Sequence, residues 1–122
     1  MPRYIDGFVL PVKKTKLAAY RKIAAKAGRI WREHGALEYI ECVGDDLNIA
    51  EMSTTFPMLA KAKPGETVIF SYIVYQSRKH RDRVNKKVMA DERLHAMCNP
   101  KNAPFDFKRM AYGGFKTMID LH

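Results

Sequence analysis

Apolar and polar residues recur with two different periods along the chain, and each period predicts a type of element. Alternation of apolar and polar residues predicts strands, because successive side chains of a strand point to opposite faces of the sheet. The predicted strands cover residues 4–12, 36–44, 67–75 and 108–120. Spacing of three and four residues predicts helices, because it places the apolar side chains on one side of the coil. The predicted helices cover residues 14–35 and 78–91, with shorter helical turns at 58–62 and 92–97.

The ends of the two long helices carry residues that are typical of helix caps. Thr15 is the expected N-cap of the first helix, and Ser77 is expected to cap the second. Gly35 is placed to end the first helix in a left-handed conformation, which glycine adopts without steric cost. The less regular stretches that contain prolines are expected to be loops, apart from the short helical turn already given: 45–66 and 98–107.

The order of the main elements is strand, helix, strand, strand, helix, strand. That order is typical of the ferredoxin-like arrangement, in which two helices cover one face of a four-stranded antiparallel sheet. The chain has 122 residues, a length that fits one domain. We therefore predict an α+β fold with a single ferredoxin-like domain over residues 1–122.

The third predicted strand, TVIFSYIVY, carries large apolar side chains on both of its faces. Two helices can cover only one face, and a contiguous apolar surface exposed to water is unfavourable. Burying each large side chain is worth roughly 1.5–3 kcal/mol. We therefore expect the second face to pack against a second copy of the chain, which makes the protein a homodimer. The alternative is that residues 45–66 fold over this face within the monomer.

Lysine and arginine outnumber aspartate and glutamate by 22 to 13, which gives a formal net charge of +9. Such a balance favours anionic partners, including nucleic acid. The element order also matches the RNA-recognition motif, and Phe70 and Tyr72 have the alternate spacing needed to stack bases. However, the third strand lacks the glycine- and base-rich pattern of that motif, and the charge lies on the helices. Nucleic-acid binding is therefore the alternative function.

Cysteine usage and hydropathy indicate the cellular compartment. Cys42 and Cys98 do not make a disulfide framework, and one bridge between them stays open. We see no charged-then-apolar leader and no apolar run near ~18 residues. The expectation is a cytoplasmic protein with reduced thiols and no contact with a membrane.

Four stretches of the sequence resemble one bacterial family: IDGFVLPV, AGRIWREHGALEYIECVGDD, SRKHRDRVNKKVMAD and PFDFKRMAYGGF. It is the domain-of-unknown-function family numbered 1428, and the resemblance covers nearly the whole chain. The resemblance implies a ferredoxin-like domain of the dimeric α/β-barrel type, shared with antibiotic-biosynthesis-type monooxygenases. The resemblance to this family implies no particular reaction. Whether the chain is an enzyme stays open, and cofactor-free, monooxygenase-like chemistry is an expectation from fold analogy alone.

Three residues are candidates for catalysis in a pocket between helices and sheet. His34 ends the apolar stripe of the first helix, where it is placed either to act as a general acid or base or to bind the last carbonyls. Glu38 lies on the second strand and either serves the pocket or forms an ion pair with Arg3 or Arg109. Tyr112 lies on the last strand, and its alternative role is ordinary core packing.

Three further residues are candidates for binding a small-molecule ligand: Tyr72, His80 and Arg109. The alternative for His80 is a place on the solvated basic surface of the second helix. The spacing of His34, Glu38 and Asp45 is not that of a compact metal motif, so no metal is expected. The Gly113-Gly114 pair lies inside a strand and does not form a phosphate loop. We therefore expect no cofactor.

Overall fold

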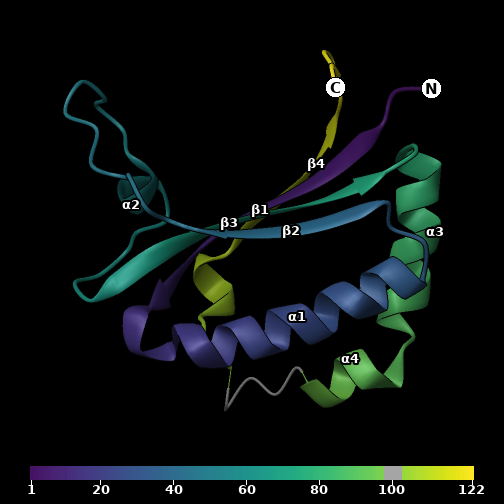
Figure 1. Cartoon of the computed structure of the whole chain (residues 1–122), viewed down its shortest axis with the longest axis horizontal. Helices are drawn as coiled ribbons and strands as arrows, with labels where there is room; N and C mark the ends of the chain where they lie inside the picture. The colour runs from purple at the N-terminus through teal and green to yellow at the C-terminus, as the bar shows by residue number, and fades with distance from the viewer. Residues whose placement is uncertain (98–102) are drawn as a thin grey trace.

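Four strands form one antiparallel sheet in the order β2-β3-β1-β4 (Figure 1). Their bounds are Tyr4–Lys13 (β1), Glu38–Val43 (β2), Glu66–Tyr75 (β3) and Ala111–Lys116 (β4). The long central strands β1 and β3 pair along their whole length, from Tyr4 opposite Tyr75 to Lys13 opposite Glu66. The computed structural model describes residues 1–97 and 103–122. The α+β class expected from the sequence is confirmed.

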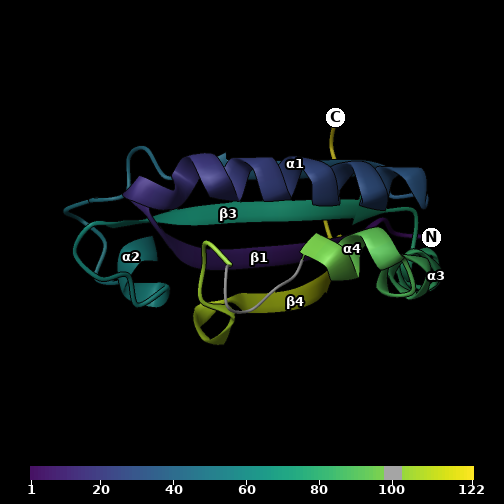
Figure 2. The same cartoon turned by 90° about the horizontal axis from the view of Figure 1, so that it is seen from below.

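Helices cover the two sides of this sheet unequally. The α-helices are α1 (Leu17–Glu33), α2 (Phe56–Leu59), α3 (Arg78–Met89) and α4 (Glu92–Met97), and the 3-10 turns are η1 (Lys14–Lys16) and η2 (Phe107–Arg109). Helices α1 and α4 lie below the sheet in Figure 1, while α2 lies on the opposite side. Figure 2 shows α1 running along the length of β3. Among the described residues, no helix combines the length and the apolar character needed to cross a bilayer.

Two of the three predicted helix ends are confirmed by the structure, and one is wrong. The Ser77 hydroxyl accepts a hydrogen bond from the His80 N–H at 3.1 Å, and Gly35 ends α1 with a φ of +116°. The expected N-cap at Thr15 is wrong. Residues 14–16 form the 3-10 turn η1, so α1 begins after Lys16, and the side chain of its N-cap residue, Lys16, makes no capping hydrogen bond within the described part of the chain.

The last strand is shorter than the predicted range of 108–120. Asp106 accepts a hydrogen bond from the Lys108 N–H at 3.0 Å, and this contact bends the chain into η2 before the strand begins. The strand ends where Thr117 turns its N–H to the Arg3 carbonyl, at 3.0 Å. Part of the loop expected over 98–107, including Cys98, lies outside the described residues.

The two faces of the sheet differ in how well they are covered. The helix face, which looks toward α1, carries Leu10, Ile69 and Ile73, each no more than 3% exposed. The opposite face, called the open face below, carries Phe70 at 45% and Phe115 at 62% exposure. The expectation that β3 is apolar on both faces is therefore confirmed. The α2 segment covers only one end of the open face, where the Phe56 ring lies 6.3 Å from that of Phe70.

Candidate functional site

A cavity of about 470 Å³ lies between the helix face of the sheet and the helices that cover it. Aromatic side chains form part of its walls: Phe8, Tyr20, Trp31, Tyr39, Phe105, Phe107 and Tyr112. A smaller set of polar side chains also lines it: Asp6, Glu41, Ser71, Asn85 and His95. An apolar cavity with a few convergent polar groups is the usual form of a small-molecule site. We refer to it as the helix–sheet cavity.

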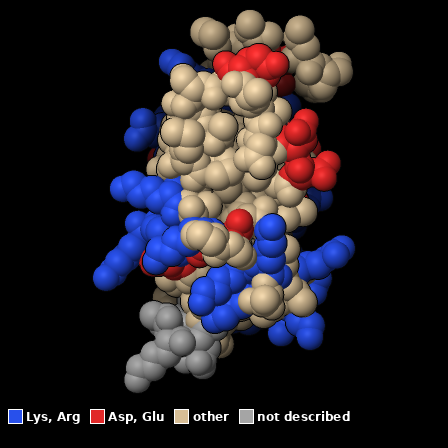
Figure 3. Space-filling view, turned by 90° about the vertical axis from the view of Figure 1, so that its left-hand side faces the viewer, with Lys and Arg blue, Asp and Glu red and all other residues tan. Residues whose placement is uncertain are grey.

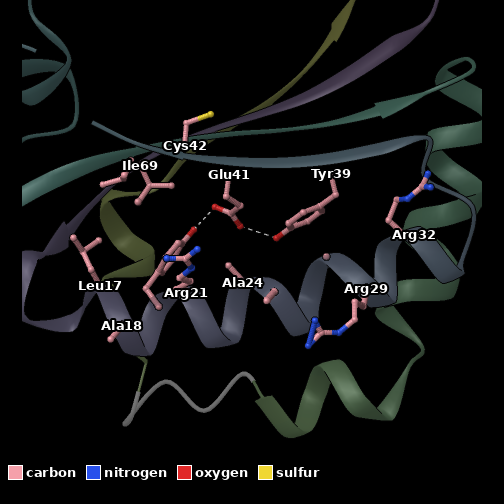
Figure 4. Close-up of a pocket in the computed structure, with 14 residues that line it drawn as sticks. Leu17, Ala18, Arg21, Ala24, Arg29, Arg32, Tyr39, Glu41, Cys42 and Ile69 are labelled. Carbon is pink, nitrogen blue, oxygen red and sulfur yellow. Dashed lines mark hydrogen bonds between the residues drawn. The ribbon is translucent and has the colours of Figure 1, made fainter. Parts of the chain in front are cut away.

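Glu41 projects from β2 toward α1 and accepts hydrogen bonds from two tyrosines (Figure 4). The Tyr20 hydroxyl donates to Oε1 at 2.6 Å, and the Tyr39 hydroxyl donates to Oε2 at 2.7 Å. Burial raises the pKa of both phenols, and the charge of Glu41 raises it further. Both phenols therefore keep their protons at neutral pH and remain donors to the carboxylate.

A second depression, called the outer groove below, runs between α1 and the edge strand β2 and measures about 850 Å³. It shares Tyr20, Tyr39 and Glu41 with the helix–sheet cavity, so these residues form the wall between the two spaces. Three arginines of α1 line the groove and give it a basic character: Arg21, Arg29 and Arg32 (Figure 4). Arg32 donates to the backbone carbonyls of Ala36 and Leu37.

Asp6 is the most deeply buried carboxylate of the helix–sheet cavity, with 1% of its surface exposed. Nη1 of Arg81 lies 3.0 Å from its Oδ1, and the Asn85 amide donates to its Oδ2 at 3.4 Å. Burial raises the pKa of Asp6, and the charge of Arg81 opposes that rise. The Asp6–Arg81 pair joins β1 to α3, and each charge is balanced by the other inside a poorly solvated site.

Asn85 connects the buried carboxylate to the aromatic wall. Its side-chain oxygen accepts hydrogen bonds from Trp31 Nε1 at 3.2 Å and from the Tyr75 hydroxyl at 3.1 Å. Two donors at the oxygen leave the amide nitrogen to face Asp6, which settles the orientation of the amide. Arg81 also donates to the Tyr112 hydroxyl at 2.8 Å. The Asn85 side chain is thus held in place by neighbours on three elements, α1, β1 and β3.

The sequence as a whole has clear relatives. The sequence model of a family described as "Protein of unknown function (DUF1428)" matches residues 3–107. The chain belongs to the DUF1428 family. It is 44% identical over 118 residues to "Uncharacterized protein YbaA" of Escherichia coli K12, which covers 97% of this chain and 98% of the relative. YbaA of Shigella flexneri matches to the same extent.

A solved structure shares the fold of this DUF1428 protein. It is a nipsnap family protein with unknown function from Agrobacterium tumefaciens, and it superposes with a TM-score of 0.59. The alignment covers 95% of this chain and 88% of the other, at 14% sequence identity. At that identity the likeness shows the fold alone. It is an independent observation that this arrangement of sheet and helices occurs in solved proteins.

Of the six residues predicted to form the site, Tyr112 lines the helix–sheet cavity and stacks on Phe8 at 4.9 Å between ring centroids. His34 lies at the end of α1, where its Nε2 is 2.8 Å from Oδ2 of Asp91. This contact joins the end of α1 to the short segment between α3 and α4. His34 is not among the residues that line the cavity or the groove.

Glu38 and Tyr72 both lie on the open face of the sheet. Glu38 is exposed, and its Oε2 lies 3.5 Å from Nη1 of Arg3, as the ion-pair alternative predicted. The Tyr72 ring packs against that of Phe70 at 6.1 Å. Neither residue lines the cavity on the other side of the sheet. Cys42 shares this face and is exposed.

His80 and Arg109 lie at opposite ends of the fold. The backbone N–H of Gln76 donates to Nδ1 of His80 at 2.9 Å, and burial lowers the pKa of this imidazole. Arg109 binds both carboxylate oxygens of Glu66, at 2.7 and 2.8 Å. Neither His80 nor Arg109 lines the helix–sheet cavity. The structure therefore does not bring the six predicted residues together.

The polar residues that the structure does bring together include Asp6 and Asn85, which the sequence did not single out. One signal was present for Asp6: it shares a face of the first strand with Tyr4 and Phe8. A carboxylate on an apolar face requires a partner. Arg81 and Asn85, four residues apart on one helix face, supply that partner.

Proposed function

We propose that this protein is a homodimer of the ferredoxin-like, dimeric α/β-barrel type that binds a small molecule in the helix–sheet cavity. The observation that carries the proposal is the cavity itself, whose aromatic walls enclose polar groups fixed by their neighbours. Preorganised polar groups in an apolar enclosure reduce the cost of binding. The exposed thiol of Cys42 agrees with a reducing compartment, so the cytoplasm is the proposed location.

The homodimer is supported by the amount of apolar surface on and beside the open face. Phe70 and Phe115 are 45% and 62% exposed, and Met118 beyond β4 is 92% exposed. Figure 3 views the end of the molecule that carries α2, where an uncharged surface lies above the region in which lysine and arginine gather. A soluble monomer rarely exposes so continuous an apolar surface. A second copy of the same face supplies the self-complementary cover that a two-fold dimer requires.

Light scattering tests the dimer. The wild-type chain, whose mass is 14.0 kDa, is expected to scatter as a particle of about twice that mass. Phe70→Lys places a charge on the open face and is expected to shift the population to monomer. Ala19→Lys, on the exposed side of α1, is the matched control and is expected to remain dimeric. A monomeric wild-type protein would overturn this part of the proposal.

Ligand-observed NMR with a library of small metabolites tests the cavity. Compounds that bind the wild-type protein are expected to lose affinity when Ala27→Leu fills part of the space under α1. Ala19→Leu makes the same change on the exposed side of α1 and is expected to leave binding unchanged. Circular dichroism of both variants confirms that they fold. Binding that is equal in the two variants would exclude the helix–sheet cavity as the site.

A further inference from the structure

The charges that line the helix–sheet cavity are opposite in sign to the net charge of the protein. The chain carries a formal charge of +9. Among the described residues, however, the cavity is lined by two carboxylates and by no lysine or arginine. Arg81 contacts the cavity residues Asp6 and Tyr112, while Arg21, Arg29 and Arg32 line the outer groove, which Glu41 also borders. The carboxylates that line the cavity therefore outnumber the arginine that contacts them.

The two carboxylates of the cavity are neutralised to different extents. Asp6 has Arg81 at 3.0 Å, so its charge is balanced inside the protein. Glu41 has no cationic partner within 4.0 Å among the described residues, and accepts hydrogen bonds only from the hydroxyls of Tyr20 and Tyr39. Neutral hydroxyl donors satisfy the lone pairs but leave the formal charge in place. Glu41 is thus a partly buried anion that lacks a counter-ion.

Ser71 places a hydroxyl beside Glu41 on this wall. It is 6% exposed, lies opposite Glu41 in the pairing of β2 with β3, and lines the cavity. A serine hydroxyl can both donate and accept a hydrogen bond, so it can bind a polar group of a ligand in the cavity. The same cross-strand row continues to Phe8 and Tyr112, which supply aromatic surface.

We propose that the helix–sheet cavity binds an apolar organic amine in its ammonium form. The ammonium group hydrogen-bonds to Glu41 and Ser71, and the apolar body lies against the aromatic walls. Three features of the site match this class: an anion without a counter-ion, a serine hydroxyl beside it, and aromatic rings whose faces attract cations. The inference rests on the proposed small-molecule function and specifies its ligand class.

Calorimetry with three probes of similar shape tests the inference: 2-phenylethylamine, 2-phenylethanol and 3-phenylpropionate. The amine is expected to bind the wild-type protein about tenfold more tightly than the neutral alcohol, and the carboxylate is expected to bind most weakly. Glu41→Gln is expected to abolish the preference for the amine. Glu33→Gln removes the same charge from an exposed position on α1 and is expected to keep it.

Ser71→Ala is the second variant, so that the test does not depend on the folding of Glu41→Gln. It is expected to weaken the binding of the amine by several-fold, while the binding of the alcohol changes less. Equal binding of the amine and the carboxylate to the wild type would overturn the amine class and keep the small-molecule function. If both variants still bind the amine more tightly than the alcohol, the amine class is likewise overturned and the small-molecule function is kept. No heat from any probe up to about 10 mM would overturn both proposals.

Discussion

The Tyr20 hydroxyl of α1 lies 2.6 Å from Oε1 of Glu41 in β2. Strand β2 is at the edge of the sheet, and among the described residues it pairs with β3 alone. The contact therefore ties the edge strand to the helix layer at a point where the sheet supplies no second neighbour. Because the acceptor is a carboxylate, the hydrogen bond is of the stronger, charge-assisted kind.

Removing this hydroxyl is expected to destabilise the protein. Tyr20→Phe should lower the free energy of unfolding by about 2 kcal/mol, because a buried hydrogen bond to a charged group is lost. Urea denaturation measures the change. Tyr72→Phe removes a hydroxyl on the open face, and its effect is expected to be within about 0.5 kcal/mol. Equal effects of the two substitutions would show that the bond to Glu41 contributes little to stability.

Gly28 is expected to tolerate no side chain while the Tyr39 ring lies beside it. A Cβ at this position would lie 2.6 Å from Cδ1 of Tyr39. Gly28→Ala should therefore cost about 1–3 kcal/mol, despite the better helix propensity of alanine. In a Tyr39→Ala background the same substitution should be neutral or stabilise by up to about 1 kcal/mol. A double-mutant cycle from denaturation curves measures the difference, and additive effects would contradict the prediction.

The two carboxylates that contact Arg81 are expected to differ in importance. Asp6→Asn leaves the guanidinium without its buried partner and should cost roughly 3 kcal/mol of stability. Asp82→Asn removes a partner at 2.9 Å whose side chain is 59% exposed, and should cost less than about 1 kcal/mol. Thermal denaturation at neutral pH ranks the two variants. The opposite ranking would mean that burial does not govern the contribution of these pairs.

Glu66 is expected to make stability depend on pH in the acid range. Hydrogen bonds from Arg109 lower the pKa of Glu66 from its ordinary value of 4.5 to about 2 in the folded protein. A lowered carboxyl pKa contributes stability that is complete above pH 4.5 and is lost as the pH falls through about 2. Glu66→Gln should remove this contribution, so its unfolding midpoint in urea should fall less steeply with acid. Parallel curves for variant and wild type would contradict the prediction.

The sequence determined most of the secondary structure, because each element depends on neighbours within a few positions. The strand alternation, the apolar stripe of α1, the Ser77 cap and the stop at Gly35 all act locally, and the structure confirms them. The departures occurred where a local signal competed with another contact. Thr15 lies within a 3-10 turn, and Asp106 starts η2 where continued strand was predicted.

Only the tertiary structure decided which polar residues share the cavity. Asp6 meets Arg81 across 75 positions of sequence, and Tyr20 meets Glu41 across 21. Such partners depend on strand order and on the side of the sheet that each helix covers, and neither is encoded in a short stretch of sequence. The sequence showed that a buried carboxylate must find a partner. Which tyrosine, arginine or ligand takes that place follows from the packing of elements distant in the chain.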